Sequence, residues 1–219
     1  MTSSHSRRRS RSVRHDTRAR ILEAAGRLFA DKGYFGTTGK EICARVGANA
    51  ASIAYHFGGT ANLYAAALEE AFARLAGCKP LTAALSRRTD AKERLTSLIT
   101  TLARTILDTP ASSWAARLIS REIIAPAVMC AGMDNPKLRA LAVLLQETVS
   151  ELTGLPRGNP AVTLSCINIM APFVILPLVS QQQLERFFPA VSFGSDSVEE
   201  TTQHLARFAL WGLAAVARN

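Results

Sequence analysis

The sequence predicts an all-helical protein of about nine helices, with a small N-terminal module and a larger C-terminal domain. Apolar residues recur at steps of three and four along most of the 219 residues, as on one face of an α-helix. Turn-forming residues separate these segments, and no stretch alternates with period two for long enough to form a sheet. Because 48% of the residues are hydrophobic and 20% are charged, the composition excludes a chain that is disordered throughout.

The net charge of +9 belongs mainly to the N-terminus. Residues 1–20 hold seven Arg and one Asp, which gives +6, while the other 199 residues hold 19 basic and 16 acidic side chains, which gives +3. Ser and Arg dominate residues 1–15, so we predict a disordered basic arm there. No apolar segment follows the arm, which therefore does not resemble a secretory signal. The charge indicates a polyanionic partner, either a nucleic acid or an anionic membrane surface.

The first predicted helix covers residues 16–32. Asp16 or Thr17 can cap its start, and Gly33 is suited to its end. Its apolar stripe consists of Ile21, Leu22, Ala25, Leu28 and Phe29.

Two short helices follow. Thr38 caps a helix over residues 39–46, in which Glu41 completes a capping box. Gly47 ends this helix, and Asn49 caps another over residues 50–55. A helix-turn-helix needs a steep change of direction between its two helices, which a residue without a side chain permits, so the pattern around Gly47 predicts this motif.

The remaining helices are longer. Thr60 caps a helix with an apolar stripe of Leu63, Tyr64, Ala67, Leu68, Ala71, Phe72 and Leu75, and residues 77–89 read as a linker. Further helices are expected over residues 90–108, 112–125, 136–152, 160–179 and 196–217, with turn signals between them.

One segment is long and apolar enough to span a bilayer. Residues 158–184 contain no charge, and 14 of the 20 residues from Ala161 to Ser180 are apolar. The segment also contains Asn168, Pro172 and Pro177, and no basic cluster flanks it. We therefore expect no membrane partner, but a helix that is buried on most of its sides, either in a core or at a subunit interface.

No pattern of catalytic or metal-binding residues is present. The four cysteines, at 43, 78, 130 and 166, are 35, 52 and 36 residues apart, without a CxxC pair or a His at metal-ligand spacing. This spacing argues against a zinc site or a disulfide framework and fits a reducing cytoplasm. We expect no enzymatic activity, no catalytic residue, no metal site and no cofactor.

The order of residues between 18 and 65 is distinctive. The stretch runs Ile21-Leu22-Glu23-Ala24-Ala25, Leu28-Phe29-Ala30, Lys32-Gly33-Tyr34, Thr37-Thr38, Glu41-Ile42, Gly47, Tyr55-His56-Phe57, Leu63-Tyr64. This fifth of the chain resembles the TetR family of transcriptional regulators. The C-terminal part, in which Arg121-Glu122 is followed by a Pro and then by a long apolar helix, is similar to the CecR-like branch of that family.

The resemblance implies a domain organisation and a set of partners. Residues 16–64 would form the DNA-binding domain, and residues 65–219 a helical domain for effector binding and dimerisation. Members of the family are homodimers that bind palindromic operators in double-stranded DNA and dimerise through their last two long helices.

The resemblance also assigns DNA contacts. Thr38 and Lys40 would lie on the operator backbone, and Tyr55 and His56 would contact phosphates. Four residues would lie at the start of the recognition helix: Asn49, Ala50, Ser52 and Ile53. For Tyr55 the alternative is a core aromatic.

The module departs from the family in its charge. Members usually carry Lys at the position of Thr60, and residues 21–64 hold only four basic against three acidic residues. The arm, with Arg7, Arg8, Arg9, Arg11 and Arg14, can compensate by lying in the adjacent minor groove. The alternative is an arm that serves solubility only.

Two groups of residues in the C-terminal domain are candidate sites. Six could line an effector pocket, because they combine an aromatic ring, thioethers and polar groups: Trp114, Arg117, Arg121, Glu122, Met129 and Met133. The alternative is a core Trp with Arg residues on a solvated face. A second group is expected at the dimer interface: Asn168, Met170, Phe173, Leu205, Phe208 and Trp211. For Asn168, Met170 and Phe173 a ligand contact is the alternative.

The sequence therefore predicts a cytoplasmic, homodimeric transcriptional repressor that an unknown small-molecule effector releases from its operator. The alternative is a DNA-binding protein of the same fold without an effector.

Overall fold

The computed structural model describes residues 3–76, 90–107, 110–127, 136–189 and 198–218. These residues form ten α-helices and one 3₁₀ helix, and no strand, so the predicted all-helical class is confirmed. The helices are α1 (Ser3–Lys32), α2 (Gly39–Val46), α3 (Ala51–Phe57), α4 (Thr60–Ala76), α6 (Ala91–Leu107), α7 (Pro110–Ile124), α8 (Pro136–Thr153), α9 (Pro160–Ile175), η1 (Leu176–Leu178), α10 (Gln181–Phe187) and α11 (Val198–Val216).

The helix boundaries follow the local signals in the sequence. Thr38 accepts a hydrogen bond from the Glu41 amide at 3.2 Å, as an N-cap does. The carboxylate of Glu41 accepts from Lys32 Nζ at 2.5 Å, a contact outside the expected capping box. Gly33 and Gly47 have φ values of 75° and 64°, in the left-handed region that allows a helix to end.

Three predictions about local structure are wrong. Residues 3–15, expected to be a disordered arm, continue α1, which is 30 residues and therefore about 45 Å long. Residues 3–15 contain no Gly or Pro that would stop the helix. The expected helix over residues 160–179 ends at Ile175, after which η1 contains Pro177. The short helix α10, with a capping box between Ser180 and Gln183, was not expected. The linker predicted over residues 77–89 lies outside the described residues.

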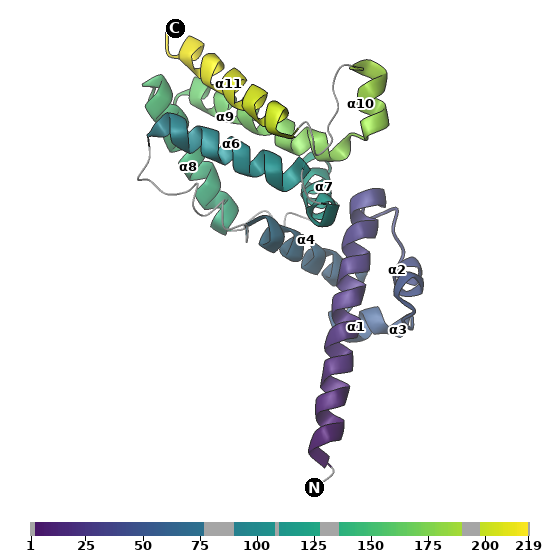
Figure 1. Cartoon of the computed structure of the whole chain (residues 1–219). Helices are drawn as coiled ribbons and strands as arrows, with labels where there is room; N and C mark the ends of the chain where they lie inside the picture. The colour runs from purple at the N-terminus through teal and green to yellow at the C-terminus, as the bar shows by residue number, and fades with distance from the viewer. Residues whose placement is uncertain (1–2, 77–89, 108–109, 128–135, 190–197, 219) are drawn as a thin grey trace.

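The helices surround two apolar cores. The first joins α1–α4 with one face of α7, through residues such as Phe29, Ile42, Leu63 and Leu118. The second joins α6, α8, α9 and α11, through residues such as Leu95, Val149 and Ile169. In Figure 1, α4 leads from the N-terminal helices to the upper body, where α7 lies over the end of α1. Helix α7 therefore belongs to the C-terminal half in sequence and to the N-terminal core in packing.

Trp114 of α7 packs directly on the backbone of α1. A Cβ atom added to Gly26 would overlap three atoms of the Trp114 ring. The ring is held from its other sides, because Arg74 lies 4.7 Å from its centroid and Glu23 accepts from its Nε1 at 3.1 Å. The close approach of α1 and α7 therefore requires glycine at position 26.

We predict that Gly26→Ala lowers the free energy of unfolding by about 1–3 kcal/mol, measured by urea denaturation at a fixed protein concentration. The substitution should otherwise gain about 0.5–1 kcal/mol from helix propensity, so a loss reports the overlap with Trp114. The control is Gly158→Ala, because a Cβ there meets no atom within 4 Å. An unchanged midpoint for Gly26→Ala would show that the ring moves aside at no cost.

Candidate nucleic-acid interface and the contacts that hold it

The turn between α2 and α3 is fixed by backbone hydrogen bonds. The Gly47 amide donates to Ala44 at 3.3 Å, and the Ala48 amide donates to Cys43 at 2.9 Å. Asn49 Oδ1 then accepts from the Ala51 amide at 3.0 Å, which starts α3. Ile42 and Cys43 are buried in the first core, so the pair of helices is anchored from one side. The opposite side of α2 and α3 faces solvent.

Most of the residues assigned to DNA lie on this open side. Thr38, Lys40, Asn49 and Ala50 are exposed. Tyr55 is 68% exposed, which excludes the core alternative within this chain. Ser52 and His56 are half-buried, and the ring centroids of Tyr55 and His56 lie 4.9 Å apart. Seven of the eight assigned residues are therefore exposed or half-buried.

Ile53 is the exception. It is 4% exposed and belongs to the first core, and a Cβ on Gly39 would lie 3.3 Å from its Cδ1. Its side chain packs α3 against α2 and is not available to DNA, contrary to the assignment. A position one step from Ser52 lies about 100° round the helix, which is enough to turn it from the solvent to the core.

Basic side chains from α1 surround this surface. Arg18 lies 4.8 Å from the centroid of the Phe57 ring, and Arg20 donates to the Val46 carbonyl at 2.7 Å. Arg20 thus binds the C-terminal end of α2, where the helix dipole favours a cation. Sequence reasoning counted these two residues only as part of a charged tail. Figure 1 shows α1 continuing past α2 and α3 as a single projecting helix.

Three α7 residues predicted to line an effector pocket contact α1. Trp114 is 2% exposed and packs on Gly26, as described above. Arg117 pairs with the Asp31 carboxylate at 2.5 Å. Arg121 donates to the carbonyls of Ala30 and Asp31 at 2.6 and 2.8 Å. These three side chains therefore bind α7 to α1. Met129 and Met133 lie outside the described residues.

Arg121 satisfies the carbonyls that the end of α1 leaves free. The last carbonyls of a helix have no partner within the helix, and a guanidinium carries several donors in a planar fork. Arg121 bonds two successive carbonyls at this end and adds a positive charge where the dipole favours it. It thereby fixes the end of the helix on which α2 and α3 pack.

Glu122, the neighbouring residue, links α7 to α4. It is 2% exposed, and its Oε2 accepts from the Tyr64 hydroxyl at 2.7 Å and from the Ala127 amide at 3.1 Å. Its Oε1 makes no hydrogen bond. Burial, and then the hydrogen bond to Glu122, raise the pKa of Tyr64, which therefore stays a neutral donor at physiological pH.

Glu23 of α1 is the other acidic partner in this region. It accepts hydrogen bonds from Trp114, from Arg27 at 3.0 Å and from Arg74 at 2.8 Å. Partial burial raises its pKa, but the hydrogen bonds to Arg74 and Arg27 outweigh this and lower it. Glu23 therefore stays ionised and joins α1, α4 and α7. Its position between the residues of the first apolar stripe gave no sign of this role.

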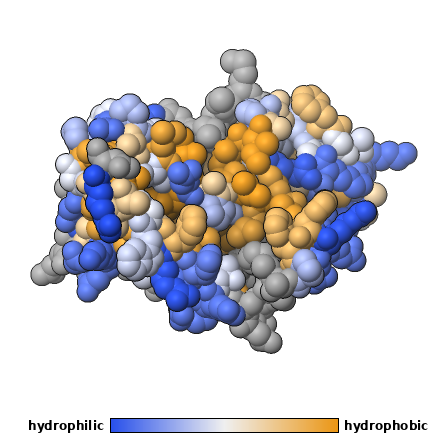
Figure 2. All heavy atoms as spheres, turned by 90° about the horizontal axis from the view of Figure 1, so that it is seen from above, coloured by the Kyte–Doolittle hydropathy of each residue, from blue (hydrophilic) through white to orange (hydrophobic). Residues whose placement is uncertain are grey.

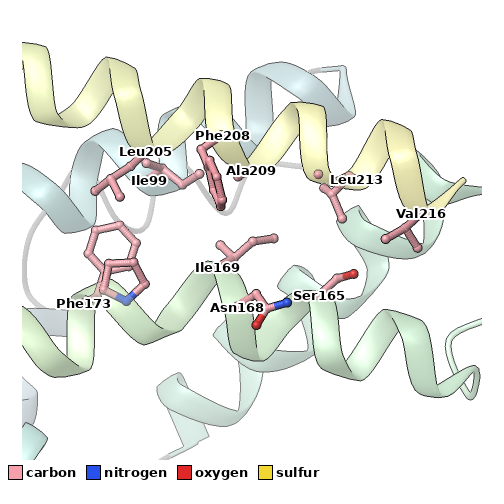
Figure 3. Close-up of a pocket in the computed structure, with 12 residues that line it drawn as sticks. Ile99, Ser165, Asn168, Ile169, Phe173, Leu205, Phe208, Ala209, Leu213 and Val216 are labelled. Carbon is pink, nitrogen blue, oxygen red and sulfur yellow. The ribbon is translucent and has the colours of Figure 1, made fainter.

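A second feature lies between α6, α9 and α11, where the structure contains a cavity (Figure 3). Four residues assigned to the dimer interface line it: Asn168, Phe173, Leu205 and Phe208. Of the other two, Met170 packs at the edge of the second core, and Trp211 points to solvent with 72% of its surface exposed. Sequence reasoning missed Ser165 and Gly212, which also line the cavity.

Only one face of α9 is buried, although burial on most sides was expected. Val162, Ser165, Ile169 and Phe173 face the second core. Leu164, Ile167 and Ile175 are more than half exposed. Residues Pro160–Leu178 are long and apolar enough to cross a membrane by length and composition alone. Among the described residues no group of three or more His, Cys, Asp or Glu could hold a metal ion.

Two family models match successive parts of the chain. A family model described as bacterial regulatory proteins, tetR family, matches residues 21–67. A model described as the C-terminal domain of the HTH-type transcriptional dual regulator CecR matches residues 91–213, which include α9. No curated protein sequence matches the chain.

Several solved structures share the fold. AibR, in complex with isovaleryl coenzyme A and operator DNA, has a TM-score of 0.65 at 16% identity, over 86% of this chain and 95% of that one. FadR from Bacillus subtilis, in complex with stearoyl-CoA, has a TM-score of 0.58 at 14% identity, over 86% and 97%. HlyIIR, a hemolysin II transcriptional regulator, has a TM-score of 0.61 at 21% identity, over 88% and 98%.

We predict that Arg121→Ala lowers the free energy of unfolding by about 1.5–3 kcal/mol, because it leaves two helix-end carbonyls without a charged donor. The matched control is Arg117→Ala, four residues earlier, which removes a largely exposed ion pair and should cost about 0–1 kcal/mol. Urea denaturation followed by circular dichroism measures both. Equal losses for the two variants would contradict the role given to Arg121.

Proposed function

Because this chain belongs to the TetR family of bacterial regulatory proteins and carries a C-terminal domain of the CecR type, we propose that it is a cytoplasmic repressor released from a palindromic operator by a small molecule. The chain is a DNA-binding transcriptional regulator, and its family consists of regulators and not of enzymes. The resemblance predicted from the sequence is thereby confirmed, including its CecR-like branch.

The observation that carries the proposal is the exposed side of α2 and α3. A recognition helix can enter the major groove only if its outer face is free and its inner face is held. Ile42, Cys43 and Ile53 hold the inner face, while Tyr55, Lys40 and Asn49 are exposed on the outer one. The small Ala50 and Ala51 allow the backbone of α3 to approach the bases closely.

We propose the homodimer because a large apolar surface of the C-terminal domain is open. Phe208 and Trp211 of α11 are more than 70% exposed, and Leu164 and Ile167 of α9 are more than half exposed. Seen from above in Figure 2, apolar side chains gather in the middle of this face. Single exposed apolar residues are common, but a continuous patch of them marks an interface. Two copies paired there would present two copies of α3 to one palindrome.

The same proposal explains how the domains communicate. Operator half-sites lie roughly 34–36 Å apart, so only one spacing of the two recognition helices fits them. Both α9 and η1 pack on α7, and α7 holds the end of α1 and the start of α4. A ligand that moves α9 therefore acts on α1 through α7. A coupling of about 1–3 kcal/mol would change operator affinity about 5- to 150-fold.

The second candidate is a DNA-binding protein of the same fold that has no effector. It is supported by the contacts of α7, because Trp114, Arg117 and Arg121, which the sequence assigned to an effector pocket, bind residues of α1. AibR and Bacillus subtilis FadR are each described in complex with an acyl-CoA, which supports an effector. The two candidates differ in whether any small molecule changes operator affinity.

The basic extension of α1, over residues 3–15, is proposed to contact DNA outside the recognised groove. A helix is about 10–12 Å wide and a minor groove about 6 Å, so the extension cannot lie in the minor groove as expected of an arm. The remaining partner for its arginines is the phosphate backbone. Contacts of this kind add affinity without sequence preference.

We predict that Tyr55→Ala abolishes operator binding and leaves the fold and the mass of the dimer unchanged. Operator fragments are first selected from genomic DNA with the wild-type protein, and binding is measured by fluorescence anisotropy. The control is Phe35→Ala, which removes another exposed aromatic from the N-terminal module. Retained binding by Tyr55→Ala, or a wild-type protein that selects no fragment, would contradict the proposal.

We predict that removal of residues 1–14 weakens operator binding and flattens its salt dependence. Each lost phosphate contact should reduce the slope of log affinity against log salt by about 0.9. Anisotropy titrations at several salt concentrations measure the slope for the full and shortened chains. If the shortened chain had the same slope of log affinity against log salt as the full-length chain, the extension would serve solubility alone.

A further inference from the structure

The cavity between α6, α9 and α11 has the chemistry of a ligand site. Its volume is about 140 Å³, and its wall is apolar except for Ser165 and Asn168. The lining contains no charged residue. In Figure 3, Ile99, Phe173, Leu205 and Phe208 lie toward one end, and the two polar side chains of α9 lie below α11. An apolar pocket with a few convergent polar groups is the usual form of a small-molecule site.

The two polar side chains have unused hydrogen-bonding capacity. Ser165 is only 7% exposed, and its hydroxyl makes no hydrogen bond to the described residues. Elsewhere in the chain, buried hydroxyls in helices bond the carbonyl four residues earlier, as Thr148 and Thr202 do. The Asn168 amide also has no partner among the described residues, but Asn168 is exposed, so its amide is open to solvent. A ligand in the cavity can bond the buried Ser165 hydroxyl and displace water from Asn168.

Pro172 adds a third polar group to the same wall. Proline has no amide hydrogen, so the carbonyl four residues before it in a helix loses its donor. In α9 that carbonyl belongs to Asn168, and both residues line the cavity. The Asn168 carbonyl therefore has no donor from within α9. These groups suit a ligand with one end that both donates and accepts hydrogen bonds.

We propose that this cavity is a ligand site, completed by a second copy of the chain, for a small uncharged molecule with an apolar body and one hydrogen-bonding end. The inference rests on the proposed function, because it identifies the effector site and needs the homodimer. Phe208, at the rim, is 74% exposed and lies on the face proposed for the partner. The site within one chain is open on that face.

The size and charge of the cavity define the ligand class. A dry cavity of about 150 Å³ holds one benzene ring, and this cavity is of that order. A phosphate or carboxylate placed here would meet no cation, and burying an unpaired charge is costly. The coenzyme A part of an acyl-CoA, with its phosphates, therefore does not fit this cavity. A neutral phenol or a comparable ring with a hydroxyl does.

The position of the cavity connects it to the DNA-binding module. Its lower wall is α9, which packs with η1 on α7, and α7 holds α1 and α4. A ligand between α9 and α11 changes the spacing of these helices within each copy and across the paired face. Both changes reach the recognition helices through the contacts described above.

The experiment titrates the full-length dimer with three probes that share a methyl-substituted benzene ring, in a calorimeter and in a thermal-shift assay. The probes are 4-methylphenol, toluene and 4-methylbenzoate, with isovaleryl-CoA as a fourth arm. We expect 4-methylphenol to bind most tightly, toluene more weakly, and the two anions not at all. Bound 4-methylphenol should raise the melting temperature as its concentration increases.

Two variants locate the binding. Ser165→Ala should weaken the binding of 4-methylphenol about 2- to 13-fold, because it removes one hydrogen bond. The affinity for toluene should not change. Gly212→Leu should abolish the binding of both, because a Cβ at Gly212 meets no atom within 4 Å and the larger side chain can enter the cavity. Gly158→Leu is the matched control, with equal open space in the turn before α9. Sedimentation checks that each variant stays dimeric.

Operator binding is measured on the same samples. If no probe binds while the operator does, the partner's side chains fill the cavity and the site is overturned, but the proposed function stands. The same conclusion follows if the probes bind equally to wild type, Ser165→Ala and Gly212→Leu. Probe binding without operator binding would support the site and overturn the proposed function.

Discussion

The packing of α7 on α1 is the contact on which the rest of this structure depends. Trp114 lies against the backbone of Gly26 with no room for a side chain between them. Arg121 holds the end of α1, and Glu122 binds Tyr64 of α4. One helix of the C-terminal half is thus built into the core of the N-terminal module. The two halves cannot move independently without breaking buried hydrogen bonds, which is costly.

This arrangement leaves two different surfaces of the molecule open. The open side of α2 and α3 carries polar side chains, and the opposite side packs in the first core. Both features suit a surface that contacts DNA. The open side of α9 and α11 is apolar and uncharged at its centre, as a surface that meets a second copy must be. The cavity lies on the second surface and α7 lies between the two. Contacts of α7 with α9, η1 and α1 therefore join the second surface to the N-terminal module.

Local signals in the sequence explain most of the helices. Thr38 and Asn49 cap as their side chains predict, and Gly47 turns the chain where a left-handed residue is needed. The basic tail shows the limit of composition as a guide. Its Arg and Ser content indicates disorder, but Arg is a good helix former and nothing in residues 3–15 interrupts α1. The position of the charge was therefore predicted correctly, but the helical conformation of residues 3–15 was not.

The sequence by itself determined most of the helices, the N-cap at Thr38, the helix-turn-helix and the family, because each depends on residues within a few positions of one another. Only the tertiary structure decided what the faces of these helices meet. It placed Ile53 in the core and turned Trp114, Arg117 and Arg121 toward α1. These contacts join residues 86 to 91 positions apart. Helical periodicity shows which side of a helix is apolar, but not which distant segment covers it.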